Sequence, residues 1–88
     1  MAGTVYVLHF SQPLAHARHY VGWTAGDAAD RLQEHLHGRG SPLVRAAVAA
    51  GITVAIALSK HGTRIDERRW HNRHGAARIC PICKGRKA

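Results

Sequence analysis

The side chains best suited to chemistry lie on segments that the sequence predicts to be regular. Arg31 and His35 are four residues apart in a helical pattern, so their side chains share one face of a helix. Glu67 stands in the first turn of a later predicted helix, and Tyr6 and Tyr20 fall in two strand-like segments. A guanidinium, an imidazole, a carboxylate and two phenols can together bind a phosphate, hold a hard cation and orient a water molecule.

Taken singly, each of these residues has an ordinary structural explanation. Tyr6 alternates with Leu8 and Phe10, a pattern typical of a strand residue that points into the core. A carboxylate such as Glu67 is favoured at a helix N-terminus by the helix dipole. Arg31 and His35 flank an apolar stripe, as exposed helix residues often do. The spacing of any one residue therefore does not establish a function.

The ordered combination is more specific, because it resembles the GIY-YIG nuclease superfamily over about residues 4–74. The resemblance is carried by the segments Val5-Tyr6-Val7, Tyr20-Val21-Gly22, Arg31-x3-His35, Gly38-x-Gly40-Ser41 and the late Glu67. Thr4 stands where the first signature of the family has glycine. The resemblance implies hydrolysis of DNA phosphodiester bonds with a single divalent ion, Mg²⁺ or Mn²⁺.

The resemblance also implies a role for each matching residue. Tyr6 and Tyr20 match the tyrosines of the two signatures, and Arg31 matches the arginine that contacts the scissile phosphate. His35 matches a residue that helps to position or deprotonate the attacking water. Glu67 matches the only metal-binding carboxylate. We expect Tyr6, Tyr20 and His35 to orient and activate water, with the proton acceptor left open.

The composition is compatible with a site that holds one metal ion. The chain has only five Asp and Glu residues, and three of them lie in or beside one predicted helix. A two-metal site requires several convergent carboxylates, whereas one carboxylate can hold one hydrated magnesium ion. A tyrosine has a pKa of about 10, so Tyr6 could accept a proton only if nearby cations lowered that pKa.

The pattern of apolar residues predicts a single small α+β domain with the element order β-β-α-α-β-α. We expect a three-stranded antiparallel sheet flanked by three helices, with residues 1–78 as the domain and 79–88 as a short basic tail. The segment 11–18 is predicted to be a loop and 52–58 a buried central strand. The expected strands are 4–10, 19–23 and 52–58, and the expected helices are 27–37, 42–50 and 63–74.

Positive charge is concentrated in the second part of the chain, which favours a polyanionic partner. The chain carries 13 Lys and Arg against five acidic residues, a net charge of +8, and residues 37–88 hold eleven of the basic residues. Such a surface favours DNA, duplex or branched, bound largely without regard to sequence. The arginines expected to contact phosphates are Arg39, Arg45, Arg68, Arg69, Arg73 and Arg78.

The two cysteines suggest a second, separate site. Cys80 and Cys83 follow His71 and His74, and these four side chains could close a tetrahedral zinc site. A free dithiol in a basic tail is the simpler alternative, and a redox motif at this position would be unusual.

Two further expectations concern cellular setting and mode of action. The first residues lack the pattern of a signal peptide and no apolar run is long enough to span a membrane, so we expect a cytoplasmic protein without membrane contact. Because the chain has little beyond one small domain, a protein partner is expected to help in targeting. The alternative to an enzyme is a non-catalytic nucleic-acid-binding module that retains the fold.

Overall fold

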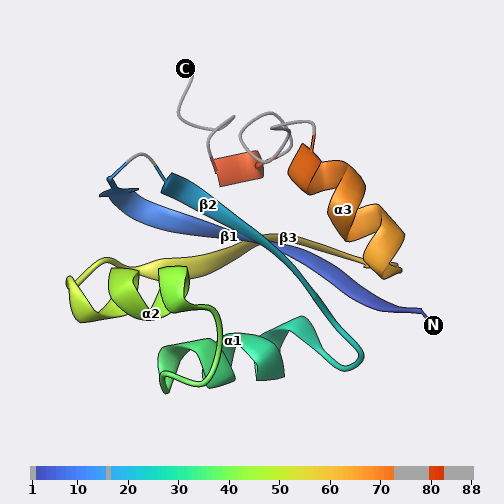
Figure 1. Ribbon diagram of the computed structural model, residues 1–88, viewed down its shortest axis with the longest axis horizontal. Coiled ribbons are helices and arrows are strands. Elements are labelled where there is room, and N and C mark those ends of the chain that lie inside the picture. Colours follow the sequence, from blue (N-terminus) through green and yellow to red (C-terminus); the bar gives the residue numbers. More distant parts are fainter. Residues whose placement is uncertain (1, 16, 73–79, 83–88) are drawn as a thin grey trace.

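An antiparallel sheet forms the middle layer of the molecule, and helices cover both of its faces (Figure 1). This computed structural model describes residues 2–15, 17–72 and 80–82. The elements follow one another in the order β1, β2, α1, α2, β3 and α3, and the strands lie in the order β2-β1-β3. The predicted fold class and element order are therefore confirmed.

The three strands are rich in β-branched and aromatic residues, which suit a pleated, half-buried sheet. β1 runs from Gly3–Leu14 and β2 from Ala17–Thr24, and they pair as an antiparallel hairpin. β3 runs from Val54–Gly62 and pairs with the other edge of β1, also antiparallel. The pairing of β1 with β3 shifts between Val7 and Leu8, because Ala57 is an extra residue on the β3 side.

Each helix begins at a residue whose side chain satisfies exposed backbone N–H groups. α1, Ala28–Leu36, begins after Asp27, which accepts a hydrogen bond from the backbone N–H of Ala29 at 2.8 Å. α2, Pro42–Ala49, begins after Ser41, which accepts from the N–H of Leu43 at 3.1 Å. These are the caps that the sequence predicts.

α3, Arg64–Asn72, begins with the predicted capping box, in which aspartate replaces the usual glutamate. The Thr63 hydroxyl accepts from the N–H of Ile65 at 3.2 Å, and Asp66 accepts from the N–H of Thr63 at 2.9 Å. The same contact holds the pKa of the Asp66 carboxyl below its usual value.

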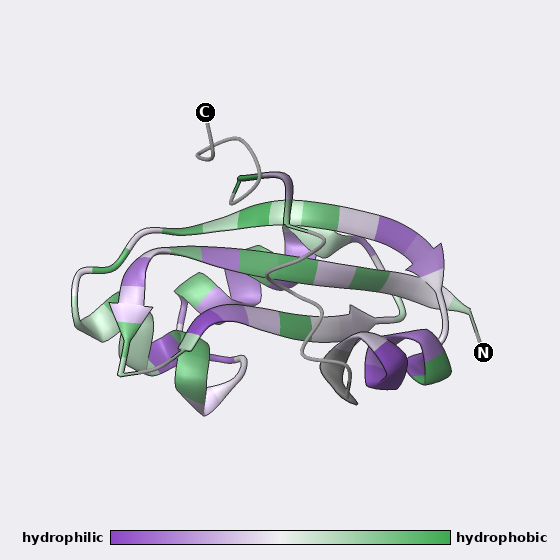
Figure 2. Cartoon of the chain, turned by 90° about the horizontal axis from the view of Figure 1, so that it is seen from above, coloured by the Kyte–Doolittle hydropathy of each residue, from purple (hydrophilic) through white to green (hydrophobic). Residues whose placement is uncertain are grey.

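The two faces of the sheet pack against different helices because side chains alternate along β1. Tyr6, Leu8 and Phe10 point toward α1 and α2 and form the larger core cluster. Val5 and Val7 point to the other face, where Trp70 of α3 packs against them. Hydrophobic residues are concentrated along the strands and α2, whereas α3 is largely hydrophilic (Figure 2).

Two sequence predictions about the strands are wrong. The segment 11–18 is not a loop, because β1 extends to Leu14 and β2 begins at Ala17. Pro13 is tolerated there because the pairing is irregular between His9 and Leu14, so no regular ladder requires its missing N–H. The segment 52–58 is not a central strand either. β1 is central, and β3 is an edge strand that has a continuous apolar run because helices cover both faces of the sheet.

Candidate active site

Tyr6 crosses from the central strand toward the edge strand β2, and Gly22 makes this possible. Gly22 lies opposite Tyr6 in the β1–β2 register. A Cβ atom at position 22 would overlap the hydroxyl end of Tyr6 and would also meet the ring of Tyr20. The glycine of the Tyr20-Val21-Gly22 segment is therefore required for a close approach of the two phenols. The Tyr6 and Tyr20 ring centres are 6.3 Å apart.

His35, on α1, completes this group. Two hydrogen bonds determine which of its ring nitrogens carries the proton. The ring is 1% exposed, and its Nδ1 accepts from the backbone N–H of Ser41 at 3.1 Å. Because Nδ1 is an acceptor, the neutral ring carries its proton on Nε2. That N–H therefore donates to the Tyr6 hydroxyl oxygen at 2.9 Å. Gly40 lies so close to the ring that a Cβ there would overlap it.

Arg31 brings a positive charge to the same hydroxyl. Its guanidinium makes a hydrogen-bonding contact with Tyr6 and an ion pair with Glu34 at 3.4 Å. Burial acts to lower the pKa of Arg31, but these two contacts raise it overall, so the side chain stays positively charged. Burial lowers the pKa of His35, and the Arg31 charge lowers it further. The imidazole is thus neutral beside a fixed cation.

Burial dominates the acidity of Tyr6. Desolvation raises the pKa of Tyr6 to about 12, and the Arg31 contact offsets only part of that effect. The condition for Tyr6 to accept a proton is a pKa lowered by nearby cations, but the lowering by Arg31 is outweighed by burial. At neutral pH the hydroxyl keeps its proton, and it can donate that proton in a hydrogen bond while it accepts one from His35.

Glu67 lies in the other layer of the molecule from this group. It lies on α3, which covers the opposite face of the sheet from α1 and packs against the edge strand β2 (Figure 1). Its charge raises the pKa of Tyr6, but it contributes least of the groups that affect that pKa. Asp66, the neighbouring acid, accepts a hydrogen bond from the Thr63 cap. Glu67 itself is half-buried.

Of the five predicted catalytic residues, four lie on one side of the sheet or on α1, whereas Glu67 lies on α3, which covers the other face. Tyr6, Tyr20 and His35 are in ring contact, with Tyr20 and His35 centred 5.4 Å apart. Arg31 on α1 lowers the pKa of Tyr6, and the more weakly acting charge of Glu67 on α3 raises it. The sequence did not show what Gly22, Gly40 and Ser41 do, because close approaches depend on atoms distant along the chain.

The predicted phosphate-contacting arginines occupy two separate places. Arg39 is exposed before the start of α2, and Arg45 is exposed on that helix. Arg68 and Arg69 are exposed on α3. Arg73 and Arg78 lie outside the described residues. Trp23, which follows Gly22, packs instead of facing solvent, since its indole N–H donates to the Gly62 carbonyl at 3.1 Å and the Arg64 guanidinium lies 4.7 Å from its ring centre.

Cys80 lies beside different histidines from those that the sequence analysis paired with it. It is fully buried, and its sulfur is 3.5 Å from Nδ1 of His9. His19 is the cross-strand partner of His9, and the two ring nitrogens are 3.4 Å apart. Burial, followed by the nearby His9, lowers the pKa of His19. The side chain of His71 is outside the described part of the structure, as are His74 and Cys83.

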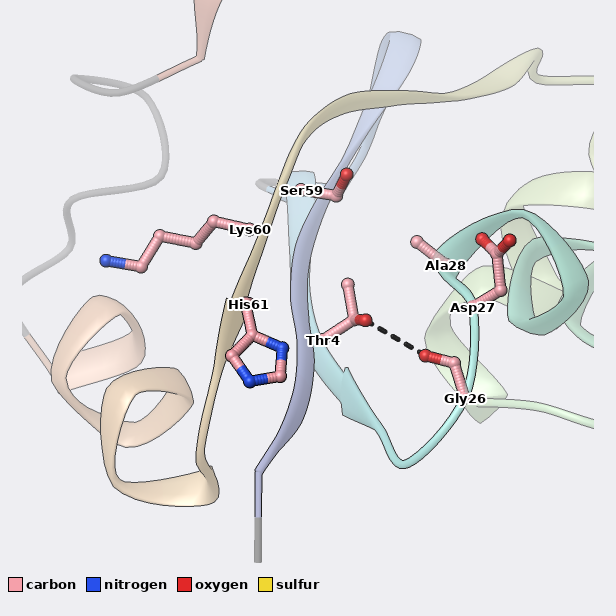
Figure 3. Close-up of a pocket in the computed structure, with 7 residues that line it drawn as sticks. All are labelled: Thr4, Gly26, Asp27, Ala28, Ser59, Lys60 and His61. Atoms are coloured by element: carbon pink, nitrogen blue, oxygen red, sulfur yellow. Dashed lines mark hydrogen bonds between the residues drawn. The ribbon is translucent and has the colours of Figure 1, made fainter.

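The cavity at the start of α1 is separate from the phenol and imidazole group. It has a volume of about 520 Å³ and lies between the ends of β1 and β3 and the residues before α1 (Figure 3). The Thr4 hydroxyl crosses it to donate to the Gly26 carbonyl at 2.9 Å, which ties the strand to the turn. Lys60 points to the other face, toward Trp70. None of the five predicted catalytic residues lines this cavity.

Comparison with protein-family models, with curated proteins and with solved structures found no match to this chain. Among the described residues, no helix is both long and apolar enough to cross a membrane.

Proposed function

We propose that this protein is a DNA endonuclease that hydrolyses phosphodiester bonds with one divalent cation. The observation that carries the proposal is the cluster of Tyr6, Tyr20 and His35, with the Arg31 charge beside it. His35 and Tyr6 share a hydrogen bond at 2.9 Å, and Arg31 lowers the pKa of that phenol. Glu67, on α3, is the carboxylate that the family resemblance assigns to the metal ion.

Arg31 is the residue that would bind the phosphate. Negative charge builds on the phosphoryl oxygens when water attacks phosphorus and the bond to the leaving oxygen breaks. A fixed cation at that place lowers the barrier because it needs no rearrangement during the reaction. The ion pair with Glu34 holds the guanidinium on α1, and its partial exposure of 29% leaves it accessible to a phosphate.

The oxygen donors among the predicted catalytic residues suit a hard cation such as Mg²⁺ or Mn²⁺. Glu67 offers a carboxylate, and Tyr6 and Tyr20 offer phenolic oxygens, whereas both nitrogens of His35 are already engaged. Glu67 would hold the ion. When bound, such an ion adds a second positive charge near the phosphate.

Tyr6 and His35 would orient the attacking water. With its pKa at about 12, Tyr6 is a hydrogen-bond donor at neutral pH and a poor proton acceptor. His35 fixes the position of the phenol, and Ser41 fixes the tautomer of His35. We therefore assign positioning to this chain of contacts and leave the removal of the water proton to a group outside it.

The basic surface would bind DNA through its phosphates. The exposed arginines of α2 and α3 favour salt-sensitive contacts that do not depend on base sequence. We therefore expect little sequence preference from the chain itself, and a protein partner that supplies targeting is part of the proposal.

A non-catalytic nucleic-acid-binding module is the second candidate, and one observation favours it. The raised pKa of Tyr6 is the value expected of a buried structural tyrosine. In such a protein Arg31 would bind a phosphate without cleavage, and the hydrogen bond between Tyr6 and His35 would only stabilise the core.

Cleavage of labelled duplex and branched DNA, with and without Mg²⁺, tests the proposal. We expect Mg²⁺-dependent nicking by the wild type, and a loss of roughly 100-fold or more in Glu67→Gln and Arg31→Ala. DNA binding, measured by fluorescence anisotropy, should persist in Glu67→Gln. Asp30→Asn and Arg18→Ala are matched controls, because these exposed residues have the same charges and lie outside the site. Binding without cleavage on every substrate would favour the non-catalytic module.

A further inference from the structure

A second cluster of possible metal ligands lies on the face of the sheet opposite the phenols. His9 follows Val5 and Val7 on the face that α3 covers, and His19 pairs with it across the hairpin. The segment 80–82 lies on the same side of the sheet as α3 (Figure 1), and Cys80 contacts His9. The ligand atoms of these three residues all lie within 4.8 Å of one another.

The separations between these atoms are those of ligands around a tetrahedral ion. With zinc–nitrogen bonds of about 2.0–2.1 Å and zinc–sulfur bonds of about 2.3 Å, tetrahedral geometry separates two nitrogens by about 3.3–3.4 Å. The same geometry separates a nitrogen from a sulfur by about 3.5–3.6 Å. The observed distances are 3.4 Å between the His9 and His19 nitrogens and 3.5 Å between His9 and the Cys80 sulfur. Two of the three separations therefore match tetrahedral ligands, and the third, between His19 and Cys80, is within 4.8 Å, so ion binding would draw these two ligands together.

The donor types select the metal. A thiolate and two imidazoles are soft or borderline ligands, which bind zinc well and magnesium poorly. The oxygen donors around Tyr6 have the opposite preference. The odd-numbered and even-numbered residues of β1 would then serve two chemically different sites on the two faces of one sheet.

We propose that His9, His19 and Cys80 bind one zinc ion, which anchors the chain after α3 to the β1–β2 hairpin. His9 and Cys80 are 71 residues apart in the sequence, so the ion closes a long loop. A crosslink of that kind restricts the unfolded chain and thereby stabilises the folded one. Since α3 lies between β3 and Cys80, the anchor also holds the helix that carries Glu67.

This zinc site differs from the set of ligands that the sequence spacing suggests. That set takes both histidines from the end of α3 and the residues after it, whereas the proposed set takes them from the hairpin. Cys80 belongs to both sets. The two hypotheses therefore differ in which pair of histidines the metal requires, and substitution can separate them.

Metal analysis of untagged protein tests the proposal directly. We expect about one zinc per chain in the wild type, and a tetrahedral cobalt spectrum with sulfur-to-cobalt charge transfer after exchange. Substitution of a residue that only hydrogen-bonds to a metal ligand weakens metal binding about 10–100-fold. Substitution of a ligand itself should weaken it at least that much, so we expect this of His9→Gln, His19→Gln and Cys80→Ser. His37→Gln, at an exposed histidine in the turn after α1, is the matched control and should retain the metal.

The result is decided by metal content, which does not depend on any nuclease activity. Absence of stoichiometric zinc or cobalt binding by the folded wild type would overturn the proposal, even if some variants failed to fold. Full zinc retention in His9→Gln and His19→Gln, with loss in a His71→Gln/His74→Gln double variant, would overturn it as well. Retention in that double variant supports it.

Discussion

Acid should destabilise this protein through His35. A proton added to the Nδ1 of that ring would face the backbone N–H of Ser41, so two hydrogen-bond donors would point at each other in a buried place. The Ser41 N–H donates to Nδ1, and a proton on Nδ1 would replace the acceptor with a second N–H. Burial and the Arg31 charge already lower the pKa of His35 in the folded state. The unfolded chain, with an ordinary histidine pKa of about 6.5, therefore binds a proton that the folded chain resists.

The sign and the size of the effect follow from this linkage. Where the unfolded state binds more protons, stability rises with pH, so it must fall as the pH drops below about 6.5. The slope approaches about 1.4 kcal/mol per pH unit until the folded pKa is reached. By about pH 5.0 the loss is therefore at most about 2 kcal/mol.

Urea unfolding at about pH 7.5 and about pH 5.0 measures this effect when the wild type is compared with His35→Gln. The glutamine cannot titrate, so its stability should fall less than that of the wild type, by a difference of up to about 2 kcal/mol. His19, whose pKa is also lowered, is present in both proteins and cancels in the comparison. Equal acid losses in the two proteins would refute the assignment of the His35 tautomer and of its contact with Ser41.

Three further predictions follow from individual contacts. Gly22→Ala should abolish nicking and lower stability by about 1–3 kcal/mol, since the new methyl group displaces the Tyr6 hydroxyl; unchanged cleavage and unfolding would contradict this. Thr63→Ala should cost about 1 kcal/mol, or about 4–8 °C in Tm by calorimetry, because it removes the cap of α3; an unaltered Tm would show that the cap contributes nothing. Chelation should lower Tm reversibly, and free zinc at about 1,000 times its Kd should restore about 4 kcal/mol; a Tm that does not respond to zinc would argue against the anchor.

The sequence predicted most of the fold because its signals are local. Asp27, Ser41 and Thr63 each begin a helix with a side chain that caps nearby backbone, and all three were predictable from sequence neighbours. The length of the hairpin and the edge position of β3 were predicted wrongly, since both depend on which strands pair. Apolar runs alone do not distinguish a central strand from a covered edge strand.

The candidate site was predictable only in part, for a related reason. The residue types of Tyr6, Arg31 and His35 carried a signal, but the contacts between them arise from packing over long sequence distances. The pairing of His9 with His19 could have been inferred from the predicted hairpin, since both lie in its strands. The residues next to Cys80 in the sequence did not indicate that it would lie beside these two histidines.

The alternation of side chains along β1 has a genetic consequence. Tyr6 and His9 lie on opposite faces of the same central strand, three positions apart. Insertion or deletion of one codon between them would move every later side chain of β1 to the opposite face of the sheet. To keep its apolar residues buried, one end of the strand would then have to change its register with the neighbouring strands. Such a mutation would disconnect both sites at once, whereas point substitutions can inactivate them separately. Reading-frame-preserving changes in this short stretch should therefore be the least tolerated in the chain.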